Sequence, residues 1–251
     1  MTGAVTLVCG VNFTQDYLRK IGVLKHDQKL LMTEMKKLVE AQQEKSGELE
    51  KEFYDKFNMK QVEEIIGYDF KCKAWLIEAL THKSYQREME KFNTKLDDYE
   101  RLEFLGDAVL GCLMARYFFL STQNDDKRKM PKELHKMKTS VINNNLLSLI
   151  IIENDIYKHM IYNTKAAAFK EQFDNYVATV HAMQKKCGTT NELNKQIEEK
   201  EKQSANGTID ELIQEMKSEY TPFDLDELHE HNLKIFGDVF ESLIGAVFLD
   251  S

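Results

Sequence analysis

The stretch that decides the fold reads Tyr99-Glu100-Arg101-Leu102-Glu103-Phe104-Leu105-Gly106-Asp107-Ala108-Val109-Leu110. At the helical pitch of about 100° per residue, Glu100, Glu103 and Asp107 fall in one narrow sector. The opposite sector holds apolar side chains, namely Leu102, Leu105, Val109 and Leu113. The segment therefore predicts an amphipathic helix, within about Asp97 to Leu120, that has an acidic stripe opposite a core-facing stripe.

The acidic stripe needs a compensating charge if it is sheltered from water. Like charges on one stripe repel each other, and partial burial adds a desolvation cost that a cation or a proton must offset. A solvated face of an ordinary helix is the alternative interpretation. The flanking residues are mostly apolar, which favours a sheltered stripe beside a divalent cation, and Gly106 and Gly111 indicate that another group approaches the helix closely.

A second acidic pair lies near the end of the chain, where Asp238 and Glu241 stand one helical turn apart. The residues around them should form core: Phe236, Val239, Phe240, Leu243, Ile244, Val247 and Phe248. Together the two helices predict a joint site of four carboxylates, Glu103, Asp107, Asp238 and Glu241. Oxygen ligands without cysteine or a convincing histidine favour Mg²⁺, with Mn²⁺ as a substitute, over zinc. Two such ions about 4 Å apart could support phosphodiester hydrolysis.

The composition predicts a mostly helical, intracellular protein, either cytoplasmic or nuclear. Hydrophobic residues make up 42% of the 251 residues and charged residues 30%, with 2 Pro and 11 Gly. The 4 cysteines form no Cys-x-x-Cys pair, which argues against a zinc site or a disulfide framework. No apolar run approaches the eighteen or so residues of a membrane span, so we expect no membrane partner.

The charge pattern leaves a nucleic-acid partner open. The formal net charge of −8 discourages binding to phosphate backbones. Basic residues nevertheless gather after the acidic helix, at Lys127, Arg128, Lys129, Lys132, Lys136 and Lys138. Bound metal ions would also reverse the local field. A solubilising loop is the alternative interpretation of this basic cluster.

The remaining chain predicts further helices and an insertion. Residues 1–24 favour a helix packed on one side, residues 25–60 a charged helical linker, and residues 61–251 a globular domain. One helix should start at Pro131 and run through Asn143-Asn144-Asn145, where the asparagines indicate buried hydrogen bonds, ligand contacts or a surface position. Another should span Phe169 to Met183. Residues at about 185–230 predict a polar, disordered insertion, and His229 and His231 beside it favour solvated histidines over metal ligands.

The two acidic segments also resemble a known family. Glu100-Arg101-Leu102-Glu103-Phe104-Leu105-Gly106-Asp107 is similar to the signature of ribonuclease III without a substitution, and Leu80-Thr81-His82-Lys83-Ser84 resembles the motif upstream of it. Gly237-Asp238-Val239-Phe240-Glu241-Ser242-Leu243 resembles the second acidic helix of the family. The resemblance covers roughly residues 60–251 outside the insertion and implies the all-α ribonuclease III endonuclease fold. Within the family, the likeness is to the second ribonuclease III domain of Dicer-type enzymes.

The resemblance also implies roles for residues. It implies that Glu103, Asp107, Asp238 and Glu241 ligate metal, with Asp107 and Glu241 closest to the catalytic water. Glu100 matches a secondary acidic position and is assigned to substrate or water contacts. Asn145, in the place of the family's asparagine-containing helix, and Lys132, in the basic cluster, are the other candidate substrate contacts.

On this resemblance the chain is a magnesium-dependent endoribonuclease that cleaves double-stranded RNA, with Dicer-like production of small RNAs in RNA interference. The alternative is a module that keeps the fold for RNA binding or dimerisation without cleaving. Residues 1–24 resemble the tail of a preceding ribonuclease III domain, so we expect a partner domain upstream and a helix completing this domain after Ser251.

Overall fold

The computed structural model describes residues 28–85, 97–122, 128–165, 167–187 and 234–251. The elements in these ranges are helical, and one isolated parallel bridge joins Thr81 to Ile161. No strand occurs in the part of the chain that the structure describes. The prediction of an all-α fold is confirmed.

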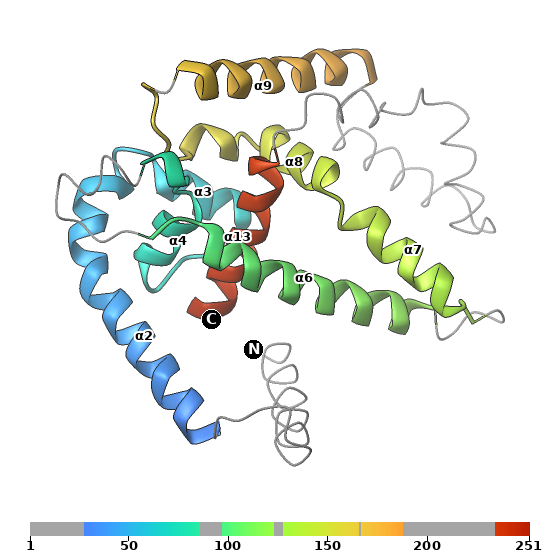
Figure 1. The fold of residues 1–251 in the computed structure, drawn as a ribbon, viewed down its shortest axis with the longest axis horizontal. Helices are drawn as coiled ribbons and strands as arrows, with labels where there is room; N and C mark the ends of the chain where they lie inside the picture. The colour runs from blue at the N-terminus through green and yellow to red at the C-terminus, as the bar shows by residue number, and fades with distance from the viewer. Residues whose placement is uncertain (1–27, 86–96, 123–127, 166, 188–233) are drawn as a thin grey trace. The chain divides into compact units, whose positions relative to one another are not determined.

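Figure 1 shows the helices of the described ranges, coloured in chain order. In chain order they are α2 (Gln28–Leu49), the π-helical turn η1 (Glu50–Tyr54), α3 (Met59–Ile66), α4 (Lys73–Ala79), the 3₁₀ turn η2 (Lys83–Tyr85), α6 (Glu100–Ser121), α7 (Pro131–Val141), α8 (Asn144–Glu153), the 3₁₀ turn η4 (Ile156–His159), α9 (Ala167–Cys187) and α13 (Ile235–Asp250).

Two units can be distinguished, and the first comprises residues 1–77 together with residues 246–251. Its buried carboxylate, Glu63 on α3, accepts hydrogen bonds from Phe70 N and Lys73 Nζ, both at 2.7 Å. Asp250 accepts hydrogen bonds from the backbone N–H groups of Lys71 at 2.8 Å and Cys72 at 2.9 Å. These carboxylates fix the loop that leads from α3 into α4.

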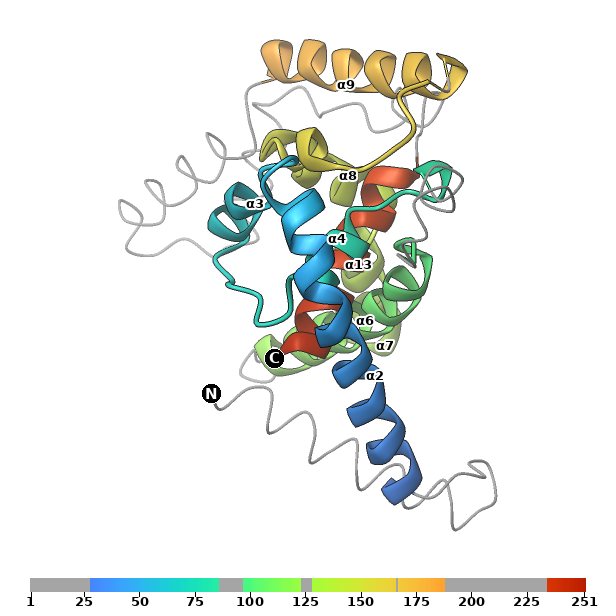
Figure 2. The same ribbon diagram turned by 90° about the vertical axis from the view of Figure 1, so that its left-hand side faces the viewer.

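The second unit, residues 78–245, contains both acidic helices. Figures 1 and 2 show α9 lying beside α8, and these two helices are in contact. An aromatic cluster joins α9 to the first turn of α13, where the ring of Phe236 lies 4.9 Å from that of Phe173 and 5.4 Å from that of Tyr176. This packing holds the start of α13 in the core of the unit.

The helix predicted to start at Pro131 is interrupted, which corrects the prediction of one continuous helix. α7 ends at Val141, and Asn143 adopts an extended conformation before α8 begins. Its side-chain oxygen accepts a hydrogen bond of 2.9 Å from Leu146 N, which satisfies one of the unpaired donors of the new helix. The asparagine run therefore marks a helix start, with Asn143 as its N-cap.

The central helix, α6, is less buried than its apolar pattern predicts. Leu102 and Val109 are buried as expected, but Leu113 is exposed, as is Phe248 at the end of α13. By length and composition α6 could also cross a membrane, in contrast to the expectation that no segment approaches a membrane span. Its carboxylates and its close packing against α13, described below, are features of a helix in a folded domain. Several large apolar side chains of α6, including Phe104 and Tyr117, are therefore exposed.

Three parts of the predicted domain organisation lie outside the described residues. They are the tail helix at residues 1–24, most of the insertion at about 185–230, and His229 with His231. α2 covers much of the segment interpreted as a charged linker. The division into tail, linker and ribonuclease III domain stays a prediction.

Candidate metal centre

Two glycines set the distance between α6 and α13. A Cβ atom on Gly106 would lie 1.7 Å from the backbone oxygen of Glu241, and one on Gly245 would lie 2.3 Å from the backbone oxygen of Leu102. Only glycine at these two positions lets the helix backbones touch. The inference of a close approach is confirmed for Gly106, whereas Gly111 has only Lys138 Nζ near it, at 3.9 Å.

The start of α13 is held in a similar way. A Cβ atom on Gly237 would lie 1.8 Å from the side-chain oxygen of Asn144. One turn later, the Ser242 hydroxyl donates a hydrogen bond of 2.7 Å to the backbone oxygen of Ala79. The acidic residues of α13 therefore sit on a helix that is fixed on both sides.

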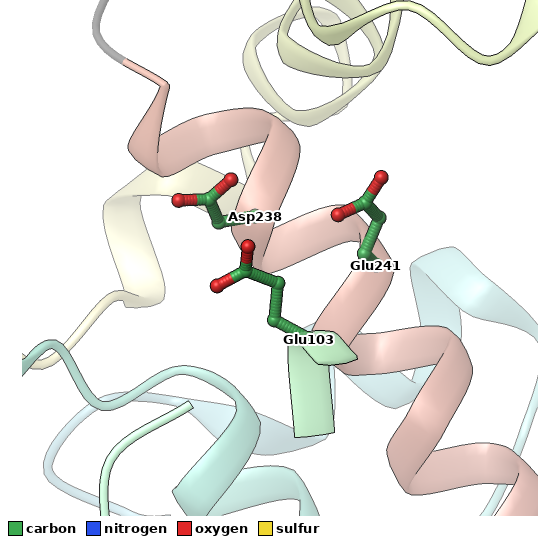
Figure 3. Close-up of side chains that lie close together, drawn as sticks. All are labelled: Glu103, Asp238 and Glu241. Atoms are coloured by element: carbon green, nitrogen blue, oxygen red, sulfur yellow. The ribbon is translucent and has the colours of Figure 1, made fainter. Parts of the chain in front are cut away.

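The contact between these helices brings three carboxylates together. One oxygen from each of Glu103, Asp238 and Glu241 lies within 4.8 Å of the other two. Figure 3 shows the three side chains close together, Glu103 from α6 and the other two from α13. We call this group the carboxylate cluster.

Burial and mutual repulsion disfavour ionisation in the cluster. Burial raises the pKa of Asp238 to about 6, and the charge of Glu103 adds to this shift while Lys234 opposes it. Burial also raises the pKa of Glu241 to about 7, with further contributions from the charges of Asp107, Asp238 and Glu103. The cluster therefore stores unfavourable electrostatic energy that a bound cation would relieve.

The other predicted site residues lie outside the cluster. Asp107 is exposed on α6, close enough for its charge to act on Glu241. Glu100 is exposed and forms an ion pair with Lys83 at 3.0 Å. Asn145 is buried in α8, and Lys132 is exposed on α7. The roles of all these residues, and of the cluster, stay predictions.

Sequence reasoning missed Lys234, which lies immediately before α13. Its Nζ atom is 2.9 Å from Glu103 Oε1 and 2.9 Å from Asp238 Oδ1, so that it bridges the two helices. These two carboxylates raise the pKa of the Lys234 ammonium. The available signal was a lysine four residues before Asp238, the spacing of an ion pair on one helix face.

The cluster fits a hard divalent cation. Its candidate ligands are all carboxylate oxygens, the donors that Mg²⁺ and Mn²⁺ prefer. Asp238 is buried, and its Oδ1 atom lies 2.9 Å from the Lys234 ammonium. A carboxylate oxygen has more than one lone pair, so this contact does not prevent it from serving as a metal ligand.

The chain is similar to known nucleases. It is 30% identical over 202 residues to endoribonuclease dcr-1 of Caenorhabditis elegans. This alignment covers 79% of this chain and 9% of the relative. It is 29% identical over 189 residues to endoribonuclease Dicer of Gallus gallus, covering 75% of this chain and 8% of the relative. The chain thus spans less than a tenth of the length of these relatives.

Two further comparisons concern the domain itself. The nuclease domain of ribonuclease III from Campylobacter jejuni aligns over 76% of this chain and 85% of its own, with 20% identity and a TM-score of 0.43. The ribonuclease III domain family matches residues 100–251, which include both acidic helices. The chain therefore belongs to the ribonuclease III family.

Proposed function

We propose that this chain forms the catalytic domain of a divalent-metal-dependent endoribonuclease that cleaves double-stranded RNA. The observation that carries the proposal is the carboxylate cluster, in which two helices of a ribonuclease III domain present oxygens within 4.8 Å of one another. A module that only binds RNA would have no need to keep three repelling carboxylates together at this cost.

In this proposal the residues of the chain have separate roles in metal binding and RNA binding. Glu103, Asp238 and Glu241 would hold magnesium, and Asp107 would add negative charge beside Glu241. A bound divalent ion, or a pair of them, activates water and stabilises the leaving oxygen of a phosphodiester. Lys132 and its basic neighbours on α7 would contact phosphates of the duplex, which accounts for RNA binding by an acidic chain.

The substrate setting follows from the relatives. Several proteins similar to this chain carry the name endoribonuclease Dicer, including those of Gallus gallus and Danio rerio. We place the chain in the second ribonuclease III domain of such an enzyme, acting in the production of small RNAs. This assignment also gives a reason for a partner domain.

The surface proposed for that partner is the exposed part of α6 around Phe104. This side chain is 81% exposed although it stands between the cluster residue Glu103 and the contact residue Gly106. We propose that this aromatic ring, exposed beside the carboxylate cluster, forms part of the interaction surface. A second ribonuclease III domain docked there would place two cluster sites on one RNA duplex.

The proposal is tested by strand-specific cleavage. Two RNA duplexes, each labelled on one strand, are incubated with the protein in Mg²⁺, and duplex binding is measured separately in Ca²⁺. Glu241→Gln should slow cleavage of the strand cut at this site by more than about 100-fold. Removing a metal ligand should cost more than removing a residue that only orients a ligand, for which the loss is about 10–100-fold. Binding should be retained.

The matched control is Glu64→Gln, which changes an exposed glutamate on α3 in the other unit. It should cleave both strands at the rate of the unchanged protein. Undiminished cleavage of both strands by Glu241→Gln would contradict the assignment of the site. An unchanged protein that binds the duplex but cleaves neither strand in Mg²⁺ or Mn²⁺ would favour the non-catalytic alternative.

A further inference from the structure

Lys234 occupies an unusual position for a lysine beside a predicted metal site. Its ammonium bridges Glu103 and Asp238, which come from different helices, at 2.9 Å from an oxygen of each. These are two of the three cluster residues. The group closest to both carboxylates, among the residues described, is thus a cation that the chain supplies itself.

The side chain of Lys234 is free to move away from this position. Its side chain is 69% exposed, whereas those of Glu103 and Asp238 are 21% and 11% exposed. A lysine on a flexible stem at the surface can return its ammonium to water, where hydration offsets part of the two ion pairs that it gives up. The carboxylates lie on two helices in backbone contact and cannot follow it.

The ammonium also compensates the cluster incompletely. A single positive charge cannot neutralise three carboxylates, and Glu241 forms no ion pair within the described ranges. A divalent ion would bind the same oxygens with twice the charge, and it would repel an ammonium held 2.9 Å from them.

We propose that Lys234 is an internal counter-cation that holds the Glu103–Asp238 pair in the metal-free protein and is displaced into water when a divalent ion binds. Lys234 is then a positioning residue that weakens metal binding and stabilises the junction of α6 and α13 until the metal arrives. This inference rests on the proposed function, since it assumes that the carboxylate cluster binds a divalent ion.

The test uses metal binding without RNA. Binding of Mn²⁺ to the full 251-residue chain is measured by electron paramagnetic resonance and by calorimetry at low ionic strength. Lys234→Met keeps the stem and removes the charge, and it should bind Mn²⁺ roughly five- to tenfold more tightly because a competing cation is gone. The melting temperature of the metal-free variant should fall, and saturating Mn²⁺ should remove the difference.

Three further variants make the result specific. Lys83→Met removes a lysine that pairs with Glu100 outside the cluster, and it should leave the Mn²⁺ affinity unchanged. Lys234→Arg keeps the charge and should restore weak binding. Lys234→Gln is a second neutral variant and should repeat the tighter binding of Lys234→Met.

The failure of this inference differs from the failure of the proposed function. Unchanged or weaker Mn²⁺ binding in both neutral variants, with binding in the unchanged protein that Asp238→Asn abolishes, would overturn the role of Lys234 alone. An unchanged protein that binds no Mn²⁺, or binds it equally well after Asp238→Asn, would overturn the metal site and this inference with it.

Discussion

At the scale of single residues, the site is defined by carboxyl groups that resist ionisation. Asp238 and Glu241 have pKa values raised to about 6 and about 7, with burial as the largest cause. In the absence of metal, a substantial fraction of Glu241 therefore carries a proton near neutral pH. The cluster gives up protons when it gains a divalent cation, so metal binding and protonation compete.

This competition predicts a pH-dependent metal affinity. Between pH 8 and pH 5.5 the apparent affinity for Mn²⁺ should fall, because Glu241 takes up a proton near pH 7 and Asp238 takes one up near pH 6. Calorimetry in buffers of different ionisation enthalpy should show proton release on binding below pH 7. An affinity independent of pH over this range would contradict the raised pKa values.

The same shift predicts that Glu241→Gln stabilises the metal-free protein. In the folded protein Glu241 stays protonated up to about pH 7, whereas in the unfolded chain it ionises near its ordinary value of 4.5. Its contribution to stability is present below pH 4.5 and is lost as the pH rises to about 7. In a chelating buffer at pH 8 the variant should therefore have a higher melting temperature than the unchanged protein, by about 2–4 °C for each kcal/mol of added stability. At pH 4.5 the two proteins should have the same melting temperature.

The exposed Glu64→Gln variant serves as the control for this measurement, because a glutamate in water gains nothing from losing its charge. It should melt like the unchanged protein at both pH values. A Glu241→Gln protein that melts lower at pH 8 would show that ionised Glu241 stabilises the fold.

At the scale of elements, the acidic helices were predictable and their joint was only partly so. The apolar spacing around Glu103 and Asp238 reports helix faces, because burial follows the pitch of 3.6 residues. The sequence does not predict the close approach at Gly245, because the role of this residue depends on which helix packs against it. The break before Asn143 was hidden because the apolar spacing continues across it, and a side-chain cap is visible only in three dimensions.

The glycine joint between α6 and α13 gives the sharpest element-scale prediction. Gly106→Ala would place a methyl group 1.7 Å from the backbone oxygen of Glu241, so the helices would have to separate. We expect the free energy of unfolding to fall by about 3 kcal/mol or more, and Mn²⁺ to bind more weakly. Thermal unfolding and metal titration measure the two effects.

The control lies on the same helix. Gly111→Ala meets only Lys138 Nζ at 3.9 Å, and alanine is the better helix former by roughly 0.5–1 kcal/mol. This variant should therefore be as stable as the unchanged protein or more so, with the same affinity for Mn²⁺. Equal behaviour of the two alanine variants would show that the helices are not held by backbone contact.

At the scale of the whole molecule, the sequence predicted the all-α fold and the helices that bear the cluster better than the surface. Leu113 follows the apolar spacing of α6 but is exposed. The sequence could not predict this exposure, because periodic spacing does not distinguish a buried face from an exposed apolar face. Lys234 was missed because a lysine beside a helix start is common, and its meaning comes from Glu103, 131 residues away. In both cases the outcome depends on which distant group lies against the residue, and the local sequence pattern does not contain this information.

The exposed surface of α6 predicts association through Phe104. The unchanged chain should self-associate at high concentration, and Phe104→Ser should weaken this association roughly 30-fold, as expected for a buried aromatic anchor. Analytical ultracentrifugation over a concentration series measures the effect. Tyr117→Ser changes another exposed aromatic residue, about opposite to Phe104 on the helix, and should have little effect. A chain that stays monomeric with Phe104 intact would contradict the proposed surface.

The contact of Gly106 with Gly245 has a consequence for how this domain tolerates change. Because peptide atoms meet at that crossing, the separation of the two helices near Glu103 and Asp238 is set mainly by the two glycines and less by the size of the surrounding apolar side chains. Neighbouring core positions can thus exchange one apolar residue for another of similar volume without detuning the site. Conservative changes in the core should therefore disturb the arrangement of the carboxylates less than a change at either glycine.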